Sequence, residues 1–223
     1  MSIHLQRDLE TLQRQVLSQS SVVEEMIRKA SRAILAIRPE LVAQIMEHEC
    51  TVNEREVRIE EDCLKILALH QPVAVDLRRT ATIMKINNDL ERMADLAVNI
   101  AERAQNLARY SEFIVPEAFD HMAQLTVSMV QNALNALVKL DVGAAREVCL
   151  CDDQVDDLNR EVIDDMRAVM RTQPELIEAA LNLFSASRHI ERIADHATNI
   201  AEDVIYLVDG EITRHQHDLH PVA

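Results

Sequence analysis

Apolar residues recur every three or four positions along most of the chain, which is the spacing of one face of an α-helix. The first such run, interrupted at Gln19, comprises Leu5, Leu9, Leu12, Val16, Val23, Met26, Ala30, Ala33 and Ile37. A heptad-like run of this length predicts a long first helix that ends before Pro39, because proline cannot continue a helix.

Helix-breaking residues divide the rest of the chain into segments of similar length. Proline is tolerated in the first turn of a helix and ends the one before it, and glycine is common just after a helix ends. The breaks predict helices at about 39–71 and 73–110, from Pro116 to a turn in LDVGAAR around Gly143, from there to Gln173-Pro174, and on to Gly210.

The composition supports an all-α fold. The 223 residues include two glycines, five prolines and no tryptophan, and 48% are hydrophobic, drawn mostly from Leu, Ile, Val, Ala and Met. Residues that favour strands are few or scattered, whereas helix formers dominate. We therefore predict six long helices and no sheet.

One segment of the sequence occurs twice. ERMADLAVNIAE at 91–102 and ERIADHATNIAE at 191–202 agree at nine of twelve positions with an offset of 100. A repeat this long indicates a duplicated half rather than a solenoid unit. With short connections, each half is expected to form an antiparallel three-helix bundle, over 1–112 and 113–210, followed by a polar tail at 211–223.

The charge of the chain limits its partners. A formal charge of −15 at pH 7, broken by no basic cluster larger than Arg78-Arg79, argues against direct nucleic-acid binding. No apolar run approaches the ~20 residues that span a bilayer, and the N-terminus lacks the apolar stretch of a signal peptide. The sequence thus predicts a soluble cytoplasmic protein whose four cysteines are buried or half-buried thiols.

The repeated segment carries an acidic stripe. On a helix, Glu91, Asp95, Asn99 and Glu102 share one arc of the surface. Carboxylates four residues apart repel each other, and this stripe lacks the Lys or Arg that usually alternates with them. A solvated surface is one interpretation, and a bound cation is the other.

Matching oxygen ligands occur on the preceding helix of each half. In an antiparallel hairpin, residues equally distant from the turn lie at the same height, which pairs Glu49 with Asp95 and Asp152 with Asp195. Oxygen side chains of this kind suit divalent or trivalent ions such as Mg, Mn, Fe or Zn. The predicted metal ligands are Glu49, Asn53, Glu91, Asp95, Asn99, Asp152, Asp156, Glu191, Asp195 and Asn199.

These repeats, together with QPVAVDLRR at 71–79, resemble the PhoU family of phosphate-signalling regulators over nearly the whole chain. The resemblance implies two three-helix bundles and an acidic motif, Glu or Asp followed four residues later by Asp, that binds multinuclear metal clusters. Three copies of the motif are present, at Glu91, Asp152 and Glu191. The fourth has Asn53 after Glu49, which makes the first site the weaker candidate.

The same resemblance implies a regulator rather than an enzyme. It implies a negative regulator of phosphate signalling that links the ATPase subunit of a phosphate ABC transporter to a sensor histidine kinase. Contact with the membrane would be peripheral, through those partners. Self-association as a homodimer through exposed helix faces also stays open.

Two other functions remain open from the residues. A ferritin-like di-metal carboxylate oxidase would use Glu with His three residues later, a spacing that no histidine of this chain has. His196, next to Asp195, is expected to lie outside the site or at the surface, and His215, His217 and His220 to lie in a frayed tail. A metal-free helical adaptor is the third interpretation.

Overall fold

The computed structural model describes residues 3–36, 38 and 40–210, and within these ranges it contains helices and no strand. The elements are α1 (Ile3–Leu35), α2 (Glu40–His70), α3 (Ala74–Leu107), α4 (Glu117–Lys139), α5 (Val142–Thr172), the short 3-10 helix η1 (Pro174–Leu176) and α6 (Ile177–Asp209). The prediction of an all-α chain with six long helices is confirmed. The predicted tail, with its three histidines, lies outside the described residues.

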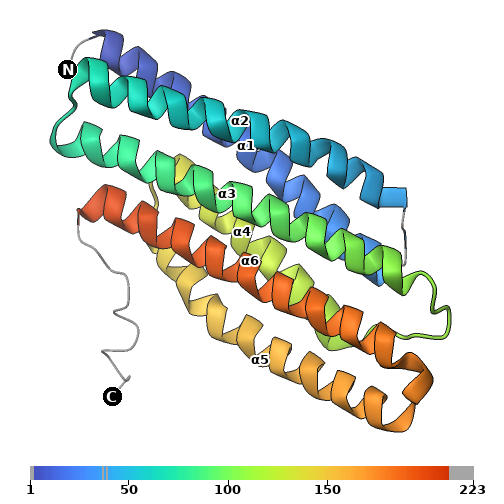
Figure 1. Ribbon diagram of the computed structural model, residues 1–223. Helices are drawn as coiled ribbons and strands as arrows, with labels where there is room; N and C mark the ends of the chain where they lie inside the picture. Colours follow the sequence, from blue (N-terminus) through green and yellow to red (C-terminus); the bar gives the residue numbers. More distant parts are fainter. Residues whose placement is uncertain (1–2, 37, 39, 211–223) are drawn as a thin grey trace, which may run out of the picture.

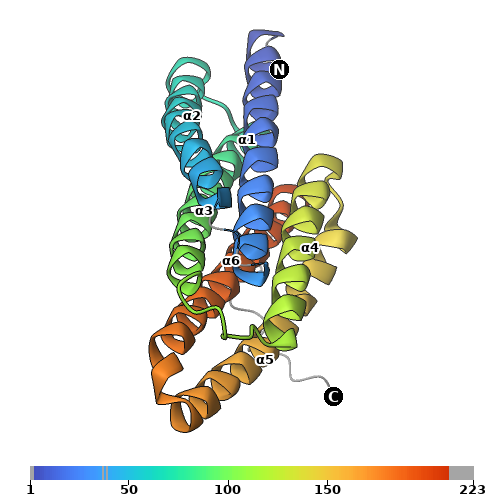
Figure 2. The ribbon, with the colours of Figure 1, turned by 90° about the vertical axis from the view of Figure 1, so that its right-hand side faces the viewer.

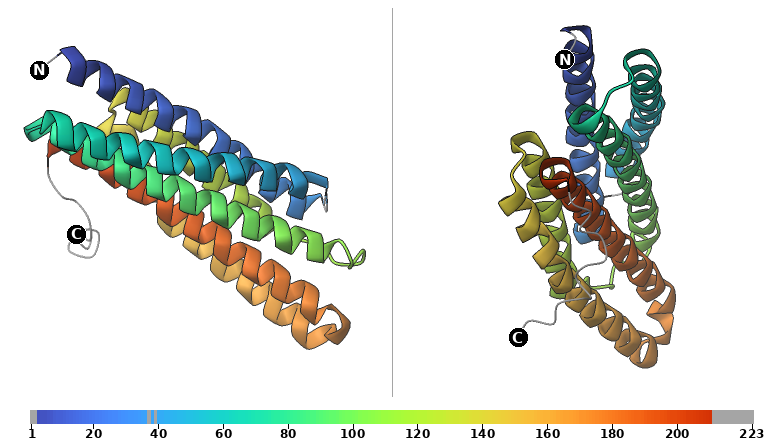
Figure 3. Two further views of the ribbon diagram at one scale, coloured as in Figure 1. Left: turned by 45° about the horizontal axis from the view of Figure 1, so that its top comes forward. Right: turned by 90° about the vertical axis from the view of Figure 1, so that its left-hand side faces the viewer.

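The six helices form two three-helix bundles. Helices α1, α2 and α3 contact one another, as do α4, α5 and α6. Helices α3 and α6 lie side by side in the middle of the molecule, with α2 and α5 on the outer sides (Figure 1). The same two groups of helices are recognisable in the turned views (Figures 2 and 3). The structure therefore confirms the predicted pair of bundles, which α3 and α6 join.

The polar interruption in the first apolar run is part of the core. Gln19 is fully buried and its Nε2 donates to Asn87 Oδ1 at 3.1 Å. Asn87 in turn donates to the backbone carbonyl of Glu56 at 2.9 Å. A buried amide is costly unless it is hydrogen-bonded, so these bonds favour one register of α1, α2 and α3.

Small residues of the repeated segment are buried against neighbouring helices. Ala94 and Ala97 of α3, and Ala194 and Ala197 of α6, are fully or almost fully buried. Side chains without bulk let two helix backbones approach closely, because interaxial distance depends on the residues at the contact. The conserved spacing of alanines within the two copies therefore has a structural role that is separate from the acidic stripe.

Polar pairs cross the contact between α3 and α6, which joins the two bundles. Lys85 binds Asp203, and Asn106 donates to Asn182 at 3.3 Å. The two helices are therefore antiparallel, because residue numbers increase along α3 in the direction in which they decrease along α6. Between them, His196 Nδ1 lies 2.8 Å from an oxygen of Asp89, and both residues are buried. Of the two positions expected for His196, the surface one is wrong, because α3 of the first bundle covers its face of α6.

The turn between α4 and α5 differs from the prediction. It lies at Leu140 and Asp141, and Gly143 belongs to the first turn of α5. Leu140 adopts the left-handed conformation, with φ of 53°, that glycine usually supplies. Asp141 then starts α5 by accepting a hydrogen bond from the backbone N–H of Ala144 at 3.0 Å. Gly143 suggested the wrong position because a capping aspartate, and not glycine, makes this turn.

The segment 71–79 ties the start of α3 to two other helices. Arg79 hydrogen-bonds to Gln13 of α1. The guanidinium of Arg78 lies against Gly210, which ends α6 with φ of 77°, and a Cβ atom there would lie 2.9 Å from Arg78 Nη1. The requirement for glycine at 210 is therefore mainly conformational, because the flexible end of the Arg78 side chain can move away from an added Cβ atom.

Replacing Gly210 by Ala should lower the stability of the protein. A left-handed conformation costs a non-glycine residue about 1–2 kcal/mol, and the Arg78 side chain must also move. We expect a fall of roughly 2–4 °C in Tm per kcal/mol lost, measured by circular dichroism. Gly143→Ala is the matched control, because Gly143 lies in the helix and its variant should be close to neutral. Equal melting of Gly210→Ala and the parent would contradict this interpretation.

Candidate functional site

The predicted ligands lie in two acidic clusters, one in each antiparallel hairpin. The α5–α6 cluster consists of Asp152 and Asp156 on α5 and Glu191 and Asp195 on α6. Each side chain is at least partly accessible to solvent. Both clusters lie on helix faces that also border the hydrophobic core, since the residues next to them in sequence, such as Val155 and Ala194, are buried.

The carboxylates of the α5–α6 cluster lie within electrostatic reach of one another. Partial loss of hydration between the helices, followed by the negative charges of Asp152, Glu191 and Asp156, raises the pKa of Asp195 to about 6. The hydroxyl of Thr198 also donates to Asp152 at 3.4 Å. Residues that the sequence placed at the same height are therefore also turned toward one another.

Two arginines neutralise part of this cluster. Arg188 Nη1 lies 2.6 Å from Glu191, and Arg160 Nη2 lies 3.9 Å from Asp156. The absence of alternating Lys or Arg from the stripe itself therefore does not leave this half without cationic neighbours. Both arginine side chains are about half or more exposed, at 49% and 68%, so these ion pairs contribute little and can open easily.

The α2–α3 cluster has a member that the sequence motif missed. Loss of hydration, then the charges of Asp95, Glu56 and Glu49, raises the pKa of Glu91, although Arg92 opposes the shift. Glu56 is half-buried, whereas the predicted ligand Asn53 is exposed. Glu56 lies seven residues after Glu49, and this heptad spacing is the signal that could have identified it.

The two predicted asparagine ligands lie one helical turn beyond the carboxylates. Asn99 and Asn199 are both half-buried. The amide Nδ2 of Asn99 donates to the backbone carbonyl of Asp95 at 2.9 Å, which leaves its Oδ1 as the remaining acceptor. The structure therefore places these residues beside the clusters, with Asn99 bonded to its own helix.

The donor chemistry fits a hard cation, but the side chains do not converge. Within residues 3–36, 38 and 40–210, no three His, Cys, Asp or Glu side chains lie close enough together to hold a metal ion. The donors of both clusters are carboxylate oxygens, which suit Mg, Mn or Fe. Ion binding would thus require the carboxylates, which repel each other in this conformation, to change rotamers.

Thiolate ligation is disfavoured beside the second cluster. Burial, followed by the charges of Glu202 and Asp152, raises the pKa of Cys149 to about 11. The four cysteines form no disulfide, and Cys63 and Cys149 are buried and Cys151 half-buried, as predicted. Cys50 is exposed, contrary to the prediction, because it lies on the outer side of α2. Cys149 is therefore a neutral core residue near the carboxylates.

Comparison with protein families identifies both halves. The model for the PhoU domain matches residues 16–104 and again 119–204. The two matches include both acidic clusters and exclude the connection between α3 and α4. None of the described helices combines the length and hydrophobicity needed to cross a bilayer.

Relatives of known family match almost end to end. A phosphate-specific transport system accessory protein PhoU homolog of Aquifex aeolicus is 38% identical over 95% of this chain and 96% of its own. The homolog of Deinococcus radiodurans is 34% identical over 92% and 97% of the two chains. The crystal structure of PhoU from Pseudomonas aeruginosa, 35% identical, matches with a TM-score of 0.90 over 92% of this chain and 99% of that one.

The titration of Asp195 should be visible in the stability of the protein. Its folded-state pKa of about 6 lies above the ordinary value of 3.8, so between these pH values the folded protein binds more protons than the unfolded chain. The contribution of Asp195 is therefore fully present below pH 3.8 and is lost as the pH rises through about 6. Without bound metal, Asp195→Asn should be more stable than the parent near pH 7.5.

We expect a gain of only about 1 kcal/mol, because solvent screens a partly exposed group. The gain should disappear near pH 4 in thermal melts of chelator-treated protein. Asp153→Asn, an exposed neighbour on α5, is the control and should show no such pH dependence. A difference between Asp195→Asn and the parent that is the same at both pH values would refute the assigned titration.

Proposed function

The chain belongs to the PhoU family, and from this premise we propose that it is a metal-binding negative regulator of phosphate uptake and phosphate-starvation signalling. Membership makes it a phosphate transport accessory and regulatory protein rather than an enzyme. The observation that carries the proposal is the match of both halves to the PhoU domain, each with its acidic cluster. A ferritin-like oxidase is not supported by this membership.

The partners follow from the relatives. Those relatives are named as accessory proteins of a phosphate-specific transport system, and a Streptococcus pneumoniae structure, 28% identical with a TM-score of 0.86, as a phosphate transport system regulatory protein. By this likeness we assign the chain a phosphate ABC transporter, through its ATPase subunit, and a membrane sensor histidine kinase as partners. Contact with the membrane is then peripheral and on the cytoplasmic side, where a signalling kinase receives such regulators.

The proposed metal sites are the two acidic clusters. Asp152, Asp156, Glu191 and Asp195 hold the ion in the second hairpin, and Glu49, Glu56, Glu91 and Asp95 in the first. A bound Mg, Mn, Fe or Zn ion supplies the positive charge that these carboxylates lack. The carboxylates lie close enough to interact: loss of hydration first, and then their mutual repulsion, raises the pKa of Asp195 and of Glu91, which supports this assignment.

The position of the clusters relates metal binding to the arrangement of the bundles. Helices α3 and α6 carry the carboxylates on one side and contact each other on another. An ion that draws α2 toward α3, or α5 toward α6, therefore changes the position of a helix that joins the two halves. In the proposed function, this is how occupancy of the sites influences the surface that partners contact.

Removing two carboxylates of the second cluster should reduce metal binding. We expect Asp156→Asn with Asp195→Asn to retain less metal than the parent after incubation with Mn and desalting, as measured by plasma mass spectrometry. Binding stabilises a protein by about 2.7 kcal/mol when the ligand is at a hundredfold excess over Kd, so Mn should raise the Tm of the parent more than that of the variant. The control, Asp153→Asn with Glu178→Gln, removes equal charge from exposed positions on the same two helices.

Full metal content in the double variant, or no effect of chelation on the parent, would favour the metal-free adaptor instead. That outcome would leave the regulatory assignment intact, because it rests on the family match. Equal loss of metal in the control would show that overall charge, and not the cluster, attracts the ion.

Deleting the gene should raise expression of phosphate-scavenging functions while phosphate is abundant. The reason is that a negative regulator no longer restrains the kinase. A transcriptional reporter for a phosphate-starvation promoter measures the effect, and a plasmid copy of the parent gene should reverse it. Unchanged expression in a strain that lacks any second copy of the gene would count against the proposed function.

A further inference from the structure

A basic cavity lies between α1 and α2, on the side of α2 that faces away from the acidic cluster. Its volume is about 490 Å³. The lining residues are Thr11, Arg14, Gln15, Ser18, Arg55, Arg58 and Ile59. Three guanidinium groups thus border one cavity to which no Asp or Glu contributes, in a chain with 38 acidic and 23 basic residues.

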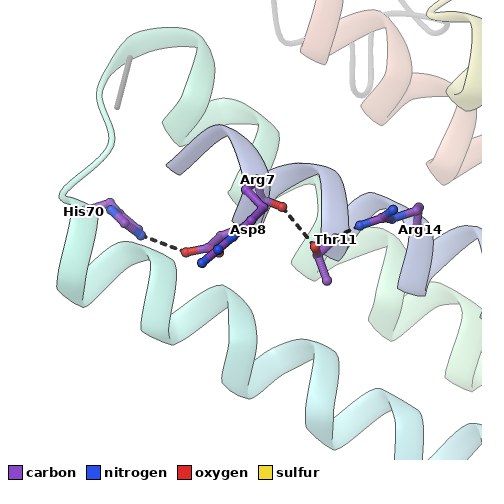
Figure 4. Close-up of polar contacts among 5 residues, drawn as sticks. All are labelled: Arg7, Asp8, Thr11, Arg14 and His70. Carbon is purple, nitrogen blue, oxygen red and sulfur yellow. Dashed lines mark hydrogen bonds and ion pairs between the residues drawn. The ribbon is translucent and has the colours of Figure 1, made fainter. Parts of the chain in front are cut away.

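The arginines are oriented by hydroxyl groups of α1. Arg14 Nη2 donates to Thr11 Oγ1 at 3.1 Å, and Figure 4 shows this contact beside the Asp8–His70 pair near the end of the two helices. Arg55 Nη1, from α2, lies 3.4 Å from both the carbonyl and the hydroxyl oxygen of Ser18. Both helices therefore contribute charge to the cavity, and both hydroxyl groups lie beside it.

Most of the positive charge at this cavity is not paired with a carboxylate of the chain. Several surface arginines have an acidic partner, such as Arg28 with Glu24 and Arg167 with Asp164. Arg58 has a weak one, Glu54 at 3.6 Å. Within the part of the chain that the structure describes, Arg14 and Arg55 form no ion pair. Like charges so gathered repel each other unless an anion lies between them.

The duplicated fold does not require this cavity. In the register that aligns Asn53 with Asp156, the positions of Arg55 and Arg58 correspond to Leu158 and Glu161 of α5. The second half therefore has an apolar and an acidic residue where the first half has two arginines. The basic character belongs to the first bundle alone.

We propose that this cavity binds a soluble anion with more than one phosphate group, of the class of inorganic tripolyphosphate. Guanidinium groups bind phosphate oxygens in a bidentate manner, so the three arginines supply the donors of the site. A single orthophosphate would leave most of the cavity to water. A nucleotide base would find no aromatic ring in the lining on which to stack. The inference is independent of the proposed function, since neither acidic cluster takes part.

The test is isothermal titration of the full-length protein with sodium tripolyphosphate. The protein is first freed of metal by chelation and dialysis. Otherwise a metal ion at an acidic cluster could bind tripolyphosphate and be mistaken for binding at the cavity. The buffer contains about 0.15 M salt, at which weak attraction between exposed charges is largely screened. We expect saturable binding at one site per chain, weaker binding of orthophosphate, and no tighter binding of ATP.

Arg14→Gln with Arg55→Gln should weaken tripolyphosphate binding about tenfold or more, because it removes two charge-assisted contacts. The control, Arg167→Gln with Arg171→Gln, removes the same charge from exposed positions of α5 and should bind like the parent. Both variants change exposed or half-buried arginines, and unchanged circular dichroism melts confirm that they fold.

Four outcomes would overturn the proposal. The first is no saturable binding, and the second is equal loss in the control, which indicates attraction by overall charge. The third is ATP binding tighter than tripolyphosphate binding, which requires recognition of the base. The fourth is arginine-dependent binding of phosphatidylglycerol vesicles in the absence of tripolyphosphate binding, which assigns the site to a lipid surface.

Discussion

The close contact between α3 and α6 is the constraint on which the rest of the structure depends. Each of these helices packs within its own bundle and also against the other bundle, so at least two of its faces are covered by neighbouring helices. Ala94 and Ala194, equivalent residues of the two copies, are fully or almost fully buried and let neighbouring helices approach closely. The faces that remain are those that carry Glu91, Asp95 and their equivalents. The repeated segment therefore combines two requirements, close helix approach and an acidic cluster, in one stretch of helix.

Buried polar pairs determine how these two helices align. Lys85 with Asp203, and Asp89 with His196, cross this contact, and Asp203, Asp89 and His196 are buried. Sliding one helix by a turn would leave Asp89, His196 and Asp203 buried without these partners, which is strongly destabilising, whereas aliphatic side chains alone would permit several registers. The polar pairs thus select the register, and this register fixes where the acidic clusters of the two halves lie relative to each other.

Features that depend only on neighbouring residues could be predicted from the sequence, whereas features that depend on contacts between distant segments could not. Proline and glycine marked most helix ends correctly, because their backbone preferences need no tertiary context. Leu140 in a left-handed conformation was missed, since the capping by Asp141 that makes it tolerable is a feature of side-chain geometry. His196 was misplaced because the opposite bundle, far away in sequence, buries it. Glu56 was missed because the search followed a four-residue motif, whereas a long helix that faces a neighbour repeats every seven residues.

The arginines beside the α5–α6 cluster bear on how selective a cation site there would be. Arg188 and Arg160 already pair with Glu191 and Asp156, so an incoming ion must compete with them. Exposed ion pairs contribute at most about 1 kcal/mol each, and a monovalent ion that contacts one carboxylate gains little more. A multivalent ion that gathers several carboxylates gains attraction from each and also removes their mutual repulsion. The cluster is open and partly neutralised. It therefore selects among cations by their charge more than by their preferred coordination geometry.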